Sequence, residues 1–106
     1  SAALEQKASG YAIAGVAAVL VFGPGDVIVF AGVGVTGVSD VPYRATAVEQ
    51  ALVGTKGTAQ DLAAAAAHAV DGKAVNSDIH ADAEYRGAMA KAYVRRALEA
   101  AAARVF

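Results

Sequence analysis

The sequence of 106 residues contains no cysteine and no tryptophan, and it contains only two prolines. Without cysteine, the chain cannot form a disulfide, a zinc-thiolate site or a cysteine-ligated iron-sulfur site from its own side chains. The chain also has no large excess of either charge, because it contains 9 basic and 10 acidic residues. A balanced chain of this kind does not predict a nucleic-acid interface. The absence of cysteine fits a cytoplasmic protein, which is the compartment we expect.

Long hydrophobic runs are missing, although 57% of the residues are apolar. The two main apolar runs, residues 11–22 and 27–38, are uncharged but are each much shorter than the ~20 residues that a spanning helix requires. Between them stands Gly23-Pro24-Gly25-Asp26, which is typical of a turn. Two short apolar runs around a turn predict a β-hairpin rather than a membrane span.

The order of the predicted elements is strands first and helices afterwards. We predict strands over residues 11–22 and 27–37, a short third strand near Tyr43 and Arg44, and a polar lead-in over residues 1–10. Helices are predicted over residues 46–53, 58–70 and 83–104. This order indicates a single α+β domain over residues 1–106, an antiparallel β-meander of about three strands packed against three C-terminal helices.

Three signals mark the beginnings of the predicted helices. Thr46 and Glu49 have the spacing of a capping box, and Thr58 and Asp61 give a weaker form of the same signal. Asp82 is the expected N-cap of the last helix.

Both faces of the first predicted strand are apolar. One face is predicted to carry Tyr11, Ile13, Val19 and Val21, and the other Ala14, Val16, Leu20 and Phe22. A sheet covered on one side by its own helices normally alternates apolar and polar residues. The last helix is also apolar over more than half of its circumference, wider than one core requires. We therefore expect the domain to sit against something larger.

Gly32, Gly34 and Gly37 spell the G-x-G-x-x-G pattern of dinucleotide-binding loops. That pattern requires the third glycine to lie at the beginning of a helix, whereas the intervening residues are mostly β-branched and favour an extended chain. The first good helix start is Thr46. We therefore interpret the glycines as part of a strand where another backbone comes close.

No group of residues in the sequence predicts a catalytic centre or a metal site. His80, Asp82 and Glu84 are spaced two apart, which does not place all three side chains on one helix face. A helix cap with a solvated histidine explains them better. His68, the serines and the basic cluster of Lys91, Arg95 and Arg96 lack partners at catalytic spacing, and Arg95 is expected to pair with Glu99.

Several segments occur together in an order and spacing that resemble one known family. They are LEQKASGYA (residues 4–12), GVTGVSDVPYRA (34–45), ALVG (51–54), AEYR (83–86) and RRA (95–97). The chain resembles, over nearly its whole length, the C-terminal domain of the flavoprotein (medium) subunit of carbon monoxide dehydrogenase-type molybdenum hydroxylases, in the xanthine dehydrogenase family.

The resemblance implies a part of an oxidoreductase rather than a complete enzyme. In such enzymes a large subunit with the molybdenum cofactor oxidises the substrate, and a small subunit with [2Fe-2S] clusters carries electrons to FAD in the medium subunit. The partners implied are those two subunits and the N-terminal FAD-binding domains of the same subunit. The isolated chain is expected to bind no flavin and to be inactive alone.

The resemblance also singles out Tyr11, which matches a family tyrosine that packs near the flavin ring. Two positions depart from the family pattern: Gly10 stands where aspartate is usual, and Ala3 where lysine is common. The implied role is to help enclose the flavin and to hold the subunit assembly together. The alternative hypothesis is a stand-alone interaction or dimerisation module without a redox role.

Overall fold

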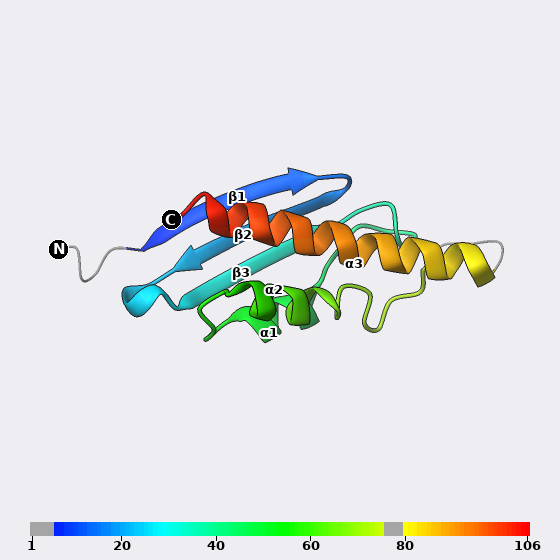
Figure 1. The fold of residues 1–106 in the computed structure, drawn as a ribbon. Coiled ribbons are helices and arrows are strands. Elements are labelled where there is room, and N and C mark those ends of the chain that lie inside the picture. The colour runs from blue at the N-terminus through cyan, green and yellow to red at the C-terminus, as the bar shows by residue number, and fades with distance from the viewer. Residues whose placement is uncertain (1–5, 76–79) are drawn as a thin grey trace.

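The computed structural model describes residues 6–75 and 80–106, which form one sheet and a layer of helices (Figure 1). The strands are β1 (Lys7–Ile13), β2 (Val16–Phe22), β3 (Ile28–Val35) and β4 (Tyr43–Arg44), with a 3-10 turn, η2 (Pro24–Asp26), between β2 and β3. The helices are α1 (Thr46–Leu52), α2 (Ala59–Ala66) and α3 (His80–Ala103). Every pairing is antiparallel, in the order β1-β2-β3-β4. The predicted α+β meander is confirmed, with four strands where about three were expected.

The extra strand arises because the run of residues 11–22 is a hairpin and not a single strand. Ala14 and Gly15 both have positive φ angles, 49° and 84°, as a tight two-residue hairpin turn requires. An added Cβ on Gly15 would lie 2.9 Å from the carbonyl oxygen of Thr36. The predicted polar lead-in was wrong from Lys7 onward, because those residues form β1. An apolar Ala-Gly pair carries little of the polarity by which turns are usually found.

The hairpin changes which residues share a face of the sheet. Tyr11 pairs with Ala18 and Ile13 pairs with Val16, so these four side chains point the same way. The prediction that Tyr11 and Ile13 share a face with Val19 and Val21 was therefore wrong. The two-residue turn reverses the chain and puts odd-numbered residues of β1 beside even-numbered residues of β2.

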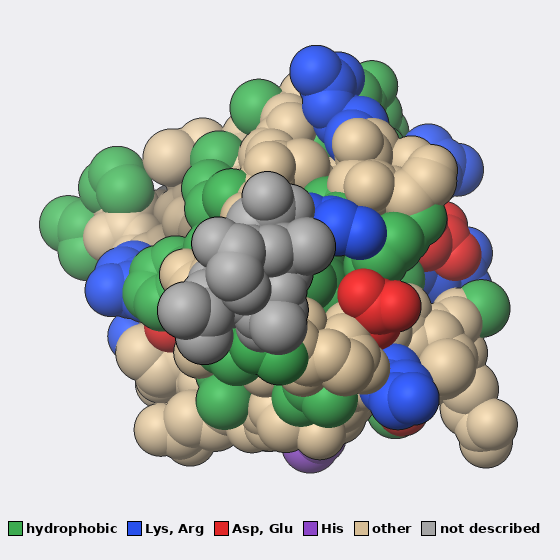
Figure 2. Space-filling view, turned by 90° about the vertical axis from the view of Figure 1, so that its left-hand side faces the viewer, with side chains coloured by type: hydrophobic (Ala, Val, Ile, Leu, Met, Phe, Trp, Pro, Cys, Tyr) green, Lys and Arg blue, Asp and Glu red, His purple; other side chains and the backbone are tan. Residues whose placement is uncertain are grey.

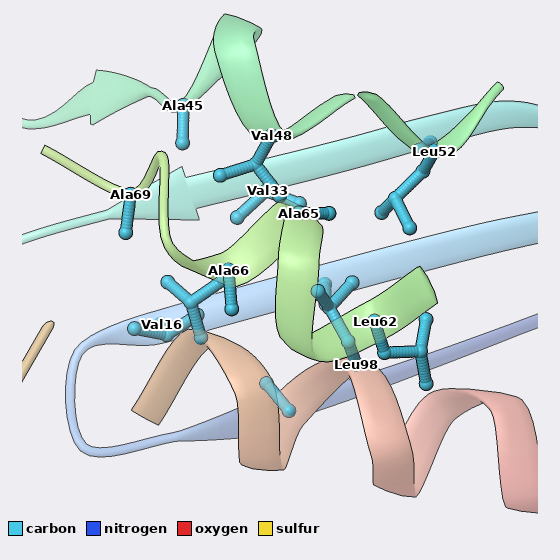
Figure 3. Close-up of a cluster of buried hydrophobic side chains, with 14 of the residues drawn as sticks. Val16, Val33, Ala45, Val48, Leu52, Leu62, Ala65, Ala66, Ala69 and Leu98 are labelled. Carbon is cyan, nitrogen blue, oxygen red and sulfur yellow. The ribbon is translucent and has the colours of Figure 1, made fainter. Parts of the chain in front are cut away.

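The hydrophobic core lies between one face of the sheet and the helices (Figure 3). α3 crosses β1 and β2, and α1 lies along β3, with α2 between the other two helices. From the sheet, the core contains the buried residues of β2 and β3. From the helices, it contains Val48, Leu52, Leu62, Val94 and Leu98. The helices cover this face of the sheet, to which β2 contributes Val16, Ala18, Leu20 and Phe22, and we call it the covered face.

The two predicted capping boxes have opposite outcomes. Thr58 and Asp61 form a complete capping box at the beginning of α2. α1 begins at Thr46 as predicted, but its N-cap position is Ala45 and no side chain caps it. The predicted N-cap at Asp82 was also wrong, because α3 begins at His80; Asp82 instead pairs with Arg86 one turn later, at 3.1 Å.

The first strand and the last helix are joined directly. The Ser9 hydroxyl donates a hydrogen bond to the carbonyl oxygen of Ala101, near the end of α3.

In the part of the chain that the structure describes, no helix has both the length and the hydrophobicity of a membrane span.

Candidate functional site

Tyr11 lies in the middle of β1, the outermost strand of the sheet, and not at the beginning of a strand as expected. It points towards the covered face, yet its side chain is 38% exposed. Gly10, where the family usually has aspartate, faces the opposite side of the sheet because neighbouring strand residues alternate. Tyr11 is therefore available to a neighbouring molecule or domain at the edge of the sheet.

A small aromatic cluster lies at the beginning of the same strand. The ring of Phe106 packs edge-on against Phe22 with 5.0 Å between the ring centroids. The ammonium group of Lys7 lies 5.2 Å from the centroid of the Phe106 ring. The side chains of Lys7, Ser9 and Tyr11 point to the same side of β1. Phe106 thus contacts β2 through Phe22 and contacts Lys7 at the beginning of β1, the strand that carries Tyr11.

The other face of the sheet has no helices over it, and we call it the open face. The pairing registers place on it Ala8, Gly10, Ala12, Ala17, Val19, Val21, Phe30, Gly32, Gly34 and Arg44. Val19 is 43% exposed and Phe30 is 47% exposed. Figure 2 shows hydrophobic side chains at its left-hand edge, the side turned away from the viewer in Figure 1. The predicted second apolar face is confirmed, although β1 contributes the residues opposite to those expected.

A shallow groove of about 710 Å³ lies at one end of the open face. Ala12, Ala17, Gly34 and Arg44 are among the residues that line it, next to the β1–β2 turn. An added Cβ on Gly34 would have no atom within 4 Å. Ala12, Ala17 and Gly34 carry only a methyl group or no side chain, and they therefore leave room for the groove.

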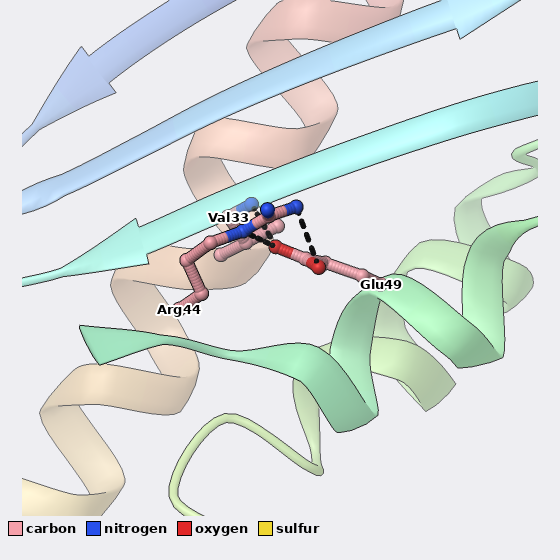
Figure 4. A network of polar contacts seen from close by, with 3 residues as sticks. All are labelled: Val33, Arg44 and Glu49. Carbon is pink, nitrogen blue, oxygen red and sulfur yellow. Dashed lines mark hydrogen bonds and ion pairs between the residues drawn. The ribbon is translucent and has the colours of Figure 1, made fainter.

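An ion pair closes the edge of the sheet beside this groove (Figure 4). Arg44 donates two hydrogen bonds to the Glu49 carboxylate, from Nε at 3.0 Å and from Nη2 at 2.9 Å. The backbone N–H of Val33 donates to the same carboxylate at 2.8 Å. Glu49 is only 8% exposed, whereas the Arg44 side chain is 61% exposed. β4 is only two residues long. The Glu49 carboxylate therefore accepts the hydrogen bond from the β3 backbone that a longer neighbouring strand would accept.

Sequence reasoning missed this network because it assigned Glu49 to a capping box with Thr46. The spacing Thr-x-x-Glu is the same in both cases, and only the nearby strand edge decides where the carboxylate goes. The arginine five residues earlier was the one available signal, and it has no diagnostic spacing on its own.

The glycine pattern behaves as predicted in one respect and differs in another. Gly32 and Gly34 lie in β3, so the dinucleotide-loop interpretation fails and the strand interpretation is confirmed. The predicted close backbone does not come from the described part of this chain. An added Cβ on Gly32 would meet the Phe30 ring at 3.3 Å, and Gly34 borders open space.

The remaining polar candidates do not assemble into a catalytic or metal-binding group. Among the described residues, no three histidines or carboxylates lie close enough to hold a metal ion. The side chain of His80 and the whole of Ser77 lie outside the described residues. His68 pairs with Asp71 at 2.6 Å on the surface.

The basic cluster of α3 lies on the helix surface. Arg96 lies over the Tyr93 ring at 5.4 Å. Within the described ranges no ion pair joins Arg95 to Glu99, so that predicted pair is wrong.

Burial raises the pKa of Tyr43, whose hydroxyl donates to the carbonyl oxygen of Ala69 at 2.9 Å.

Comparisons with known proteins agree with this geometry. The chain is 40% identical over 103 residues to the carbon monoxide dehydrogenase medium chain of Afipia carboxidovorans, covering 95% of this chain and 35% of the relative. It superimposes with a TM-score of 0.74 on a carbon monoxide dehydrogenase chain from Hydrogenophaga pseudoflava, at 29% identity over 95% of this chain and 38% of that one.

A relative named for another substrate is equally similar in structure. A chain of quinoline 2-oxidoreductase from Pseudomonas putida 86 matches with a TM-score of 0.72 and 28% identity, over 97% of this chain and 38% of that one. This chain therefore spans little more than a third of the length of its relatives.

The family model "CO dehydrogenase flavoprotein C-terminal domain" matches residues 2–101. That range includes every strand and nearly all of α3. The chain belongs to the family of CO dehydrogenase flavoprotein C-terminal domains.

Proposed function

We propose that residues 1–106 are one domain at the C-terminal end of the FAD subunit of a molybdenum hydroxylase, where the domain helps to enclose the flavin. The observation that carries this proposal is the exposed ring of Tyr11 on the outermost strand, in a family named for flavoproteins. An aromatic ring at a sheet edge is free to pack on a flat cofactor that a neighbouring domain holds.

The contribution of this chain is a contact from one side and not a complete pocket. Tyr11 points to the helix side of β1, and the groove at Gly34 lies on the opposite side of the sheet. The flavin would supply electron transfer, and Tyr11 would limit the space beside its ring. Gly10 offers no carboxylate, so any polar contact that the family's aspartate provides would come from another residue.

The parent assembly that we propose contains a large molybdenum subunit, a small [2Fe-2S] subunit and the N-terminal FAD-binding domains of this subunit. The relatives named for molybdenum-cofactor enzymes support this composition. We place the assembly in the cytoplasm, which the absence of cysteine fits. Relatives named for carbon monoxide and for quinoline share this fold, so the domain does not choose the substrate.

Substitution of Tyr11 in the full-length subunit tests this role. An aromatic contact of this kind contributes ~0.5–1.5 kcal/mol beyond area burial, so Tyr11→Ala should weaken flavin retention or shift flavin reduction by up to about tenfold. Tyr11→Phe keeps the ring and should be nearly silent. Flavin content by absorbance and reduction rate by stopped flow are the measurements.

Tyr85→Ala is the matched control, because it removes an exposed tyrosine from α3 and leaves β1 unchanged. If Tyr11→Ala lowers the melting temperature but leaves flavin content and reduction rate unchanged, the tyrosine only packs against the core and the proposal fails.

A stand-alone interaction or dimerisation module is the second candidate, and the apolar open face favours it. The mass of the native polypeptide separates the two functions. A polypeptide about three times as long as this chain supports the flavoprotein subunit, since this chain covers 35% of the Afipia relative. A native polypeptide of 106 residues would support the separate module.

A further inference from the structure

We propose that the open face is the surface through which this domain packs against the preceding part of the same polypeptide. The inference rests on the proposed function, because it takes that preceding part to exist. The surface that packs on the open face is expected to be apolar and to come close to the backbone of the sheet.

The first argument is the hydrophobicity of the open face. In a two-layer fold, the sheet face away from the helices normally carries polar residues. Here the centre of that face carries Val19, Val21 and Phe30, and the residues around them are alanine and glycine. A contiguous apolar patch of this kind on a folded domain marks an interaction site.

The second argument is the absence of unpaired charge on the open face. Arg44 is the one ionisable residue among those that the registers place there. Its guanidinium group is already neutralised by Glu49 through two hydrogen bonds. A charge that is buried without a partner opposes association, whereas a paired one is far less of an obstacle. The network therefore prepares the edge of the face for burial.

The third argument is the space above the backbone. Gly34 has no side chain on the open face, an added Cβ there would meet no atom within 4 Å, and the residue borders a groove of about 710 Å³. Its φ angle is not in the left-handed region, so the strand conformation does not require glycine there. Glycine in a strand often marks the close approach of another segment. The occupant therefore places its own side chains into this groove.

The choice of occupant follows from the family and from the position of β1. The family domain is C-terminal and spans little more than a third of its relatives, so their remaining residues precede it. β1 is the first strand after that part, and Ala8, Gly10 and Ala12 of β1 lie on the open face. A covalently linked neighbour has a high effective concentration, which favours it over a second copy of this domain.

Hydroxyl-radical footprinting of the full-length subunit tests this assignment without any substitution. The ring of Phe30 should lose most of the labelling that it shows in the 106-residue chain, whereas Tyr85 on α3 should keep its labelling. Equal labelling of Phe30 in the two proteins would overturn the proposal. So would concentration-dependent protection of Phe30 in the 106-residue chain alone, because that result assigns the face to a second copy.

Gly34→Leu and Ala64→Leu form a matched pair of substitutions. Each adds an apolar side chain at an accessible position, the first over the open face and the second on the outer surface of α2. Gly34→Leu should leave the melting temperature of the 106-residue chain unchanged but should expose the full-length subunit to proteolytic cleavage before β1. Ala64→Leu should leave both proteins intact.

The two proposals fail in different ways. If Gly34→Leu and Ala64→Leu give full-length subunits with the same resistance to protease, the open face is not the interface, whatever the flavin content of the wild-type subunit. If the wild-type subunit holds no flavin but Phe30 is protected, the interface stands and the flavin role is wrong.

Discussion

The covered and open faces of the sheet are built from similar residues but have different surroundings. Leu20 and Val19 are neighbours on β2; Leu20 is fully buried under α3, and Val19 is 43% exposed. On the covered face the residues fit helices from the same chain, and on the open face no described element covers them. Apolar composition thus identifies both faces as interfaces, and only the fold shows which one this chain completes itself.

The largest expected effect is a truncation on the covered face. Leu20→Ala leaves a cavity between β2 and α3 and should lower the free energy of unfolding by about 2–5 kcal/mol. Val19→Ala removes a side chain that is already half exposed and should change that free energy by less than about 1 kcal/mol. Urea denaturation of the 106-residue chain measures both. Equal losses would mean that the open face is also buried in the isolated chain, for example in a dimer.

A smaller loss is expected at the ion pair that links the two faces at the edge of β3. Glu49→Ala leaves the Val33 N–H without an acceptor and should lower stability by about 1–3 kcal/mol. Thr46→Ala is the control, because its side chain makes no capping hydrogen bond and should have little effect. A loss for Thr46→Ala as large as for Glu49→Ala would show that a capping box forms in solution. Thermal unfolding followed by circular dichroism distinguishes these outcomes.

The smallest effect concerns β4, where Tyr43 faces the covered side and Arg44 the open side. Burial disfavours the phenolate of Tyr43 and raises its pKa above the usual value of about 10. The unfolded chain releases this proton first, so the stability that Tyr43 contributes is complete below about pH 10 and is lost as the pH rises through the folded pKa.

Tyr43→Phe should therefore flatten the fall in unfolding free energy between about pH 9 and 11. It should also remove the hydrogen bond to Ala69, worth about 1 kcal/mol. An unchanged slope in Tyr43→Phe would contradict the assignment of this pH dependence to Tyr43.

The layers of the fold were predictable from the sequence, and its local reversals were not. Gly23-Pro24-Gly25-Asp26 marked its turn because glycine and proline stand together there. Ala14-Gly15 did not, because an alanine with a positive φ angle gives no signal in an apolar run. Missing that turn removed a strand from the prediction and moved Tyr11 to the wrong face. A propensity pattern describes local preference, whereas the register of a hairpin depends on where the chain reverses.

The candidate site shows the same limit. Gly34 was correctly placed in a strand because the residues around it are β-branched, which is a local property. The role of Glu49 depends on a backbone N–H sixteen residues earlier in the chain, which no local spacing reveals. The related motif at Thr58 and Asp61 formed its capping box because no strand edge competes for Asp61.

The contact between Ser9 and Ala101 has a consequence for synthesis of the protein on the ribosome. The β1–β2 hairpin leaves the ribosome early, but the helix that covers it is the last element in the sequence. Until the final turns of α3 emerge, both faces of the hairpin are apolar and exposed to other nascent chains. Contacts of such large sequence separation also slow folding. Chaperones that bind extended apolar segments should therefore protect this domain mainly during the interval between synthesis of β2 and of α3.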